Sequence, residues 1–325
     1  MKTIAVETNN KVEYQAIFFL VLMTITWGLT FPLINWAIDK IPAVSFVFFR
    51  FSLAALVMSP IAIIGIRQKI KNGSLPRSFF KHSMMMGIFD CIVFLTQTMA
   101  MEYTSSAKCA FITASYVVIV PFMAPLFTKD KITWMHVIRA LIAFVGMIYL
   151  CELTMEEFYG TSKDSFLGTG EILSLICAFT VAITILYIQR NTKHIDNYFE
   201  FSFMQIVFTI PLPMILFFAK GASLPPMDDF LSKQVLLPLF YCALIATALL
   251  LYLQVRFQRK TSAQNAALIY CLEPAFATIF SYFIFQEEIK ESTFKGGAII
   301  LVALLLPLFL NILSLRQRNE KIGNH

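Results

Sequence analysis

The sequence predicts an all-α integral membrane protein with ten transmembrane helices, arranged as an inverted repeat of two five-helix halves. Hydrophobic residues make up 58% of the 325 residues and charged residues only 14%, with a mean hydropathy of +0.71. These values exceed what a water-soluble domain of this size normally carries. A second observation is a set of ten apolar runs, and a third is that the stretch from Thr104 to Ile132 resembles the stretch from Thr261 to Ile289. The chain therefore belongs in a bilayer and is internally duplicated.

The ten apolar runs each reach the length of about 20 residues that one membrane span needs. Residues 1–14 are polar and carry both signs of charge, so the first run starts too late and is too long for a signal peptide. The longest connections are too short for a soluble domain and are rich in charge, Gly, Pro or Ser. The predicted spans are 15–37, 42–66, 79–101, 104–127, 132–151, 168–189, 197–219, 233–254, 262–285 and 293–313.

The repeat has an offset of 157 positions, which places Thr104 on Thr261, Ser105 on Ser262 and Asp130 on Glu287 without a gap. Each copy reads as a long apolar helix closed by a charged turn. Because each half, 15–151 and 168–313, contains an odd number of spans, the second half inserts upside down relative to the first. In such an architecture we expect the fourth and ninth helices to face each other, the first, third, sixth and eighth to complete a wall, and the fifth and tenth to lie outside.

The distribution of basic residues predicts the orientation of the chain in the membrane. Of 26 Lys and Arg residues, 17 lie on the side of both termini and 6 on the opposite side, while Arg50, Lys108 and Arg139 are assigned to helices. By the positive-inside rule, both termini are expected in the cytoplasm. The basic residues sit in short loops and build no continuous face, which argues against binding of nucleic acid despite a net charge of +6.

Internally duplicated membrane halves are typical of secondary transporters, whose substrate sites lie between the repeats near the bilayer midplane. An integral membrane enzyme is one alternative, but it would need a water-facing constellation of catalytic groups, and the four His residues are scattered. A channel is the second alternative, although channels are usually oligomers around one axis. The six Cys residues form no CxxC pair. We therefore expect no metal, no cofactor and no catalytic residue.

Two carboxyl groups, those of Asp90 and Glu273, fall near the midpoints of their spans. A carboxylate at this depth is costly, because burial disfavours the charged form, so each is a functional candidate. Such a group binds a proton or a cationic substrate, or it has a structural task. For Glu273 the structural alternative is that its carboxyl group satisfies backbone groups freed by Pro274. For Asp90 the repeat places Thr247 at the same position, so the architecture requires no charge there and function is favoured.

Four further residues are candidates for the wall of a substrate site. Trp27 lies mid-helix, away from the interfacial belt where Trp is usually found, and Gly28 follows it. Its stripe of neighbours at helical spacing is compatible with simple packing, but a central Trp also offers a flat apolar face to a ligand. Three more residues supply hydroxyl and amide groups, as expected of a largely apolar small-molecule pocket: Gln97, Tyr116 and Tyr270.

The remaining charged residues of the apolar runs have a structural interpretation. Arg50 lies about a third of the way along its span, where it either snorkels towards the extracellular headgroups or pairs with a carboxylate of a neighbouring helix. Arg139 and Lys108 lie within two turns of helix ends, so their long stems are expected to reach water. The others lie near the membrane interfaces: Glu171, Glu200 and Arg256.

Several motifs in order resemble the EamA-type drug/metabolite transporters. They are WGLTF from Trp27, the arginine of FFRFSLAAL at Arg50, TSAQNAALIYCLEP ending at Pro274, and the acidic pair Glu287 and Glu288 before Gly296 and Gly297. The first half departs from this pattern, with Tyr116 at the position of Glu273 and Val117 at that of Pro274. The resemblance implies a ten-helix carrier working by alternating access, in a family that moves amino acids, nucleoside-like metabolites and other small polar compounds.

These observations together predict a secondary transporter of a small polar or zwitterionic metabolite, amino-acid-like or nucleoside-like, in the cytoplasmic (inner) membrane of the cell. Protons are the candidate coupling ion, acting through Asp90 or Glu273. The expected partners are a small-molecule substrate and the lipid bilayer.

Overall fold

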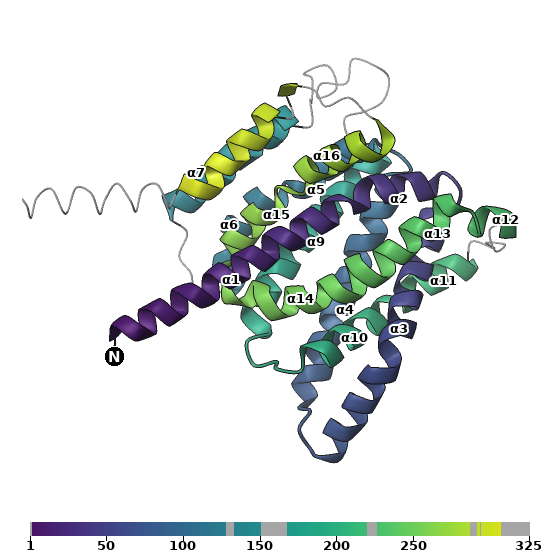
Figure 1. Ribbon diagram of the computed structural model, residues 1–325, viewed down its shortest axis with the longest axis horizontal. Coiled ribbons are helices and arrows are strands. Elements are labelled where there is room, and N and C mark those ends of the chain that lie inside the picture. The colour runs from purple at the N-terminus through teal and green to yellow at the C-terminus, as the bar shows by residue number, and fades with distance from the viewer. Residues whose placement is uncertain are drawn as a thin grey trace, which may run out of the picture.

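The computed structural model describes residues 2–127, 133–150, 168–219, 226–286, 291–292 and 294–306. All regular elements in these ranges are helices (Figure 1). The charged turn expected at Asp130 and Glu287, and the pair Glu287 and Glu288, lie outside the described residues.

The helices of the first half begin with a long pair interrupted at Leu29 and end with one helix beside the bundle. They are α1 (Lys2–Gly28), α2 (Thr30–Ile38), α3 (Ala43–Lys71), α4 (Arg77–Ala100), α5 (Ser106–Ala114), α6 (Tyr116–Phe127) and α7 (Trp134–Leu150). The second half contains α9 (Thr169–Asn191), α10 (Tyr198–Thr209), α11 (Pro211–Ala219), α12 (Met227–Phe230), α13 (Lys233–Phe240), the π-helix η1 (Tyr241–Leu249), α14 (Leu250–Phe257), the 3₁₀ turn η2 (Gln258–Lys260), α15 (Ala263–Tyr270) and α16 (Glu273–Phe285).

Eight helical stretches of the described chain are long and apolar enough to cross a membrane, and they coincide with the predicted spans one to four and six to nine. The fifth and tenth predicted spans contain shorter apolar helices, Trp134–Tyr149 and Phe294–Leu306. Both of these predicted runs extend past the residues that the structure describes. The described residues therefore contain candidate membrane helices for eight of the ten predicted spans, and the full count of ten stays a prediction.

The fourth and ninth spans are broken at the same repeat position. In the first half α5 ends at Ala114 and α6 begins at Tyr116; in the second, α15 ends at Tyr270 and α16 begins at Glu273, which is 157 positions after Tyr116. Pro274 is compatible with the start of α16, where its missing N–H would have had no helical partner. The first half breaks without a proline at this position, so the break belongs to the repeat rather than to Pro274.

The starts of these two spans are also alike. The side chain of Ser105 accepts a hydrogen bond from the backbone N–H of Lys108 at 3.2 Å, and that of Ser262 accepts one from Asn265 at 3.1 Å. Each serine thereby satisfies one of the free N–H groups of a helix start. The two serines are aligned by the offset of 157, so the sequence repeat is also a repeat of local structure.

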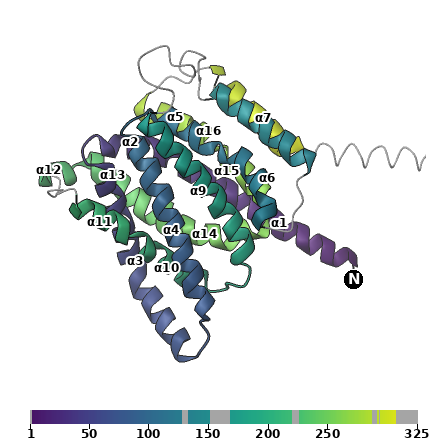
Figure 2. The same ribbon diagram turned by 180° about the vertical axis from the view of Figure 1, so that it is seen from behind.

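The helices pack in matching pairs across the two halves. In the first half α4 packs against α9 and α10, and its counterpart in the second half, η1 with α14, packs against α1 and α3. The contacts between α3 and α10 join equivalent helices of the two halves, and those of α6 with α15 and of α5 with α16 join the equivalent fourth and ninth spans. Figure 2 shows α4 and α9 side by side on the reverse face of the bundle. Each half therefore completes the other, as expected of an inverted repeat.

The helix α7 lies beside the bundle, next to the apolar helix Phe294–Leu306, drawn in yellow in Figure 1. A Cβ atom at Gly146 would lie 2.8 Å from the carbonyl oxygen of Gly296, so the backbones of these two helices approach closely. The expected outer position of the fifth and tenth helices agrees with this arrangement.

Candidate functional site

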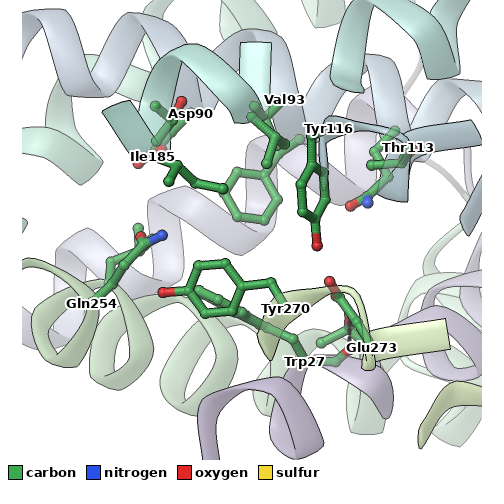
Figure 3. A pocket seen from close by; sticks show the side chains of 15 residues that line it. Trp27, Asp90, Val93, Thr113, Tyr116, Ile185, Gln254, Tyr270 and Glu273 are labelled. Atoms are coloured by element: carbon green, nitrogen blue, oxygen red, sulfur yellow. Dashed lines mark hydrogen bonds between the residues drawn. The ribbon is translucent and has the colours of Figure 1, made fainter. Parts of the chain in front are cut away.

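One cavity lies between the two halves, with about 670 Å³ of empty space when the part open to solvent is included. Its walls come from the first, third, fourth, sixth, eighth and ninth spans, the same six helices that the repeat predicts. The lining residues are Trp27, Thr30, Asp90, Val93, Phe94, Gln97, Thr113, Tyr116, Val181, Thr184, Ile185, Leu251, Gln254, Tyr270 and Glu273 (Figure 3).

All six residues singled out from the sequence line this cavity: Asp90, Glu273, Trp27, Gln97, Tyr116 and Tyr270. Residues at equivalent repeat positions of the two halves line it together. With the offset of 157, five pairs of lining residues are Trp27 and Thr184, Phe94 and Leu251, Gln97 and Gln254, Thr113 and Tyr270, and Tyr116 and Glu273. The cavity therefore lies where the two halves meet, with matching contributions from each.

The aromatic wall is held in place by hydrogen bonds to neighbouring helices. The indole Nε1 of Trp27 donates to the carbonyl oxygen of Ala246 in η1 at 3.0 Å. The ring of Trp27 meets that of Tyr270 edge-on, with 5.4 Å between centroids, and the Tyr270 hydroxyl donates to Oε1 of Gln258 at 3.0 Å. Because these polar atoms already have partners, both residues offer mainly apolar ring surface to the cavity.

Asp90 lies in the wall with only 3% of its surface exposed. Its Oδ2 atom accepts a hydrogen bond from Nε2 of Gln205 on α10 at 2.5 Å. The Oε1 atom of Gln205 has no hydrogen-bond partner within the described part of the chain. The carboxyl group of Asp90 is thus positioned by a neutral amide and not by a cation.

Arg50 on α3 is 1% exposed, which contradicts the first of its two alternatives, that it snorkels to the headgroups. Its Nε donates to the hydroxyl of Thr247 at 2.7 Å, and its Cζ lies 4.5 Å from the ring centroid of Phe94. Among the described residues it forms no ion pair within 4.0 Å. It nevertheless interacts electrostatically with Asp90 and Glu273. Helix packing around Arg50 shields it from lipid headgroups, which the sequence alone does not reveal.

The contacts of Arg50 and Asp90 are counterparts in the two halves. Thr247 occupies the repeat position of Asp90, and Gln205 lies 155 positions after Arg50, close to the repeat offset. Each central helix thus receives a hydrogen bond from the neighbouring span of the opposite half. The charge falls on the acceptor, Asp90, in one pair and on the donor, Arg50, in the other. The two opposite charges therefore share the site without touching.

Glu273 begins α16, and the structure shows no side-chain cap at this helix start. Within the residues that the structure describes, no hydrogen bond reaches its carboxyl group, which contradicts the alternative that it satisfies backbone groups freed by Pro274. Figure 3 shows the carboxyl group and the Tyr116 hydroxyl pointing towards each other in the cavity. Glu273 is therefore available to an occupant of the cavity.

Several charged residues near the span ends have partners in the structure. Lys108 pairs with Glu171 at 2.8 Å, and Lys69 pairs with Glu200 at 2.5 Å. Arg256 donates to the hydroxyl of Tyr252 at 2.6 Å.

Arg139 departs from the expectation that its stem reaches water, because it is only 4% exposed. Its guanidinium donates to the carbonyl oxygen of Ala303 at 3.0 Å and to Oδ1 of Asn265 at 3.2 Å. The helix Phe294–Leu306, which contains Ala303, therefore covers a position that appears close to a helix end in the sequence.

Sequence reasoning missed Gln205, Gln254, Thr113 and Thr184. The repeat offset was a usable signal for three of them, since it relates Gln254 to Gln97, Thr113 to Tyr270 and Thr184 to Trp27. Gln205 carries a different signal, an amide near the centre of an apolar run. No group of three or more His, Cys, Asp or Glu suited to a metal occurs in the part of the chain that was described.

A comparison of the sequence with known proteins identifies its family. The model of the EamA-like transporter family matches residues 15–151 and 168–309. The chain belongs to the EamA-like transporter family. Both matched segments contribute walls to the cavity, and membership makes this a multi-pass membrane protein of a transporter family with the family's two-repeat architecture.

Relatives of this EamA-like transporter span most of its length. An uncharacterized transporter of Archaeoglobus fulgidus is 28% identical over 289 residues, which cover 88% of this chain and 83% of the relative. Protein PagO of Salmonella typhimurium is 22% identical over 315 residues, covering 94% of each chain. A solved crystal structure superimposes with a TM-score of 0.68 at 12% identity, covering 91% of this chain and 98% of the other. At that identity the likeness supports the fold alone.

Proposed function

We propose that this EamA-like transporter carries a small polar metabolite across the cytoplasmic membrane by alternating access, with the substrate bound in the cavity between the repeats 15–151 and 168–313. The observation that carries the proposal is the set of matching lining positions from both halves. A rocking motion of one repeat against the other opens such a cavity first to one side and then to the other.

Coupling to protons is supported by the setting of the two carboxyl groups. Asp90 has an amide partner and Glu273 has no hydrogen-bond partner among the described side chains, so neither is locked in a direct ion pair. A carboxyl group in this position takes up a proton or meets a cationic group as the cavity changes access. We propose that Asp90 and Glu273 serve this coupling role.

The test of the proposed function is transport by the purified protein. A panel of metabolites is first screened for compounds that raise the melting temperature, since a ligand that binds the folded state stabilises it by mass action. Compounds that do so are then offered to proteoliposomes with and without a proton gradient. Gradient-dependent accumulation supports the proposal, whereas stabilising compounds that never cross the membrane under any gradient contradict it.

Replacement of Trp27 tests the apolar wall. We expect Trp27→Ala to weaken substrate binding by roughly 2- to 12-fold, because aromatic contacts contribute roughly 0.5–1.5 kcal/mol beyond area burial. The measurement is the concentration dependence of uptake at equal amounts of membrane-inserted protein. Trp36→Ala is the matched control, because Trp36 packs on Phe285 and does not line the cavity. Equal half-saturation in both variants would reassign Trp27 to packing.

The charge bias predicts the orientation of the two termini. Reporter fusions after Leu315 should show cytoplasmic activity and fusions at Ser162 extracytoplasmic activity, because 17 basic residues lie on one side and 6 on the other. A cytoplasmic reporter and a periplasmic reporter are tested at each position as mutual controls. If both positions report the same side, the proposed ten-span topology is wrong.

A further inference from the structure

Among the charged groups at the cavity, negative groups outnumber positive ones. Among the described residues, its lining contains two carboxyl groups, Asp90 and Glu273, and no Lys, Arg or His side chain. The described cation that interacts with both is Arg50, which stacks on Phe94 and is not itself a lining residue. With both carboxyl groups ionised, these three side chains leave one negative charge in excess. A single positive charge in the cavity therefore neutralises the site.

The rest of the lining suits a cation on an apolar body. Four aromatic residues line the cavity, and the other described lining residues are four apolar and five neutral polar side chains besides the two carboxyl groups. Aromatic faces attract ammonium groups, and this attraction strengthens when water is excluded. The aromatic residues are Trp27, Phe94, Tyr116 and Tyr270.

A zwitterion fits this lining less well than a simple amine. A carboxylate in the cavity would meet neutral donors, among them the amides of Gln97 and Gln254, but no cation among the described lining residues, and a buried charge without an opposite charge is costly. Nη2 of Arg50 has no hydrogen-bond partner within the described chain, but the residue sits behind Phe94 and does not line the cavity. The carboxylate of an amino acid would instead meet Asp90 and Glu273, which repel it.

We propose that the cavity binds one organic monocation, a protonated amine on an apolar or aromatic body, in exchange for one proton. This proposal rests on the transport function proposed above and narrows its substrate from polar metabolites in general to amines. The proton leaves the O–H of a carboxyl group for water as the ammonium group arrives, and it returns when the amine departs. Either the proton or the ammonium group alone brings the net charge of the three side chains to zero. Binding of one therefore excludes binding of the other.

The other titratable groups around the two carboxyl groups carry no charge that would upset this balance at neutral pH, since they are phenols and thiols. They come from the helices packed around the site and interact electrostatically with Arg50, with Asp90, with Glu273 or with one another. They are Tyr116, Tyr241, Tyr270, Cys91, Cys109, Cys177, Cys242 and Cys271.

A charge series on one aromatic body tests the proposal with the purified full-length protein. The probes are 2-phenylethylamine, 2-phenylethanol, L-phenylalanine and 3-phenylpropionate, which carry a positive charge, no charge, both charges and a negative charge. We expect only the amine to raise the melting temperature. Calorimetry in two buffers of different ionisation enthalpy should show about one proton released per amine bound where the site is protonated. In that range, affinity should fall about tenfold per unit decrease in pH.

Two single variants and a control make the test specific. Glu273→Gln and Asp90→Asn each remove the excess negative charge, so the amine should no longer stabilise either variant. Glu273→Gln breaks no described hydrogen bond, which keeps the test valid if Asp90→Asn is poorly folded. Asp228→Asn is the matched control, because Asp228 is exposed on α12, outside the cavity, and the amine should stabilise it as it does the wild type.

Stronger stabilisation by L-phenylalanine than by the amine overturns the proposal, and so does amine binding that survives both variants without proton release. Transport of a neutral or zwitterionic metabolite from the general panel, with no binding of the amine, overturns this inference and leaves the proposed function standing. Absence of transport for every stabilising compound counts against the proposed function itself.

Discussion

Asp90→Asn is expected to fold and insert normally and to lose proton-dependent uptake almost completely. The asparagine keeps the size of the side chain and an oxygen that accepts the hydrogen bond from Gln205. It removes the negative charge, and a hydrogen bond to a charged group contributes roughly 1.5–3 kcal/mol, which corresponds to about 10- to 150-fold in affinity. Asp90→Glu should retain part of the activity with an altered pH dependence, because the charge remains but its position shifts.

The measurement is initial uptake in proteoliposomes across a range of external pH, at matched protein content. Asp228→Asn, which removes an exposed carboxylate, should behave as the wild type. Wild-type uptake by Asp90→Asn at every pH, with normal abundance, would leave Glu273 as the carboxyl group responsible for coupling.

Gly87→Val is expected to destabilise the fold by about 3 kcal/mol, the upper end of the usual cost of overpacking. A Cβ atom at Gly87 would lie 2.6 Å from the backbone oxygen of Gln205 and 2.6 Å from Cβ of Phe208. Because one of these atoms belongs to the backbone, α4 and α10 must move apart to accept any side chain. The same contact holds Gln205 against Asp90.

The melting temperature of the purified variant in detergent checks this expectation. Gly297→Val is the matched control, since a Cβ atom at Gly297 meets nothing within 4 Å, and its melting temperature should stay near that of the wild type. Equal stability of the two variants would show that the α4–α10 contact relaxes freely.

Much of the fold was predictable because hydrophobic length and an internal repeat are properties of the sequence itself. Eight predicted spans are present as helices, and the repeat correctly predicts the six helices that line the cavity. The candidate residues were found because a polar or aromatic group at mid-span depth has few reasons to be there other than structure or function. Asp90, Glu273 and Trp27 all satisfied this criterion.

The hydrogen-bond partners of these residues were not predictable, because they depend on which helices pack against each other in the folded bundle. Arg50 has an outer position along its span, yet packing shields it and gives it Thr247 as a partner. Arg139 lies near a helix end, yet a helix more than 150 residues later buries it. Gln205 was missed because an amide carries no charge, so the free-energy cost of placing it inside an apolar run looks small. Depth along a single helix is visible in a sequence, whereas lateral contacts require the assembled bundle.

The paired lining positions also bear on the energetics of the proposed cycle. In an unaltered duplicate, the forms open to either side would be related by a two-fold rotation and have equal free energy, and an empty carrier would face each side half of the time. Gln97 and Gln254, which occupy equivalent positions, retain this symmetry. Two other pairs break it, because Tyr116 is equivalent to Glu273 and Asp90 is equivalent to Thr247. These differences remove the degeneracy of the two forms. In the proposed cycle, the empty carrier would therefore favour one side, and the divergence between the halves would select that side.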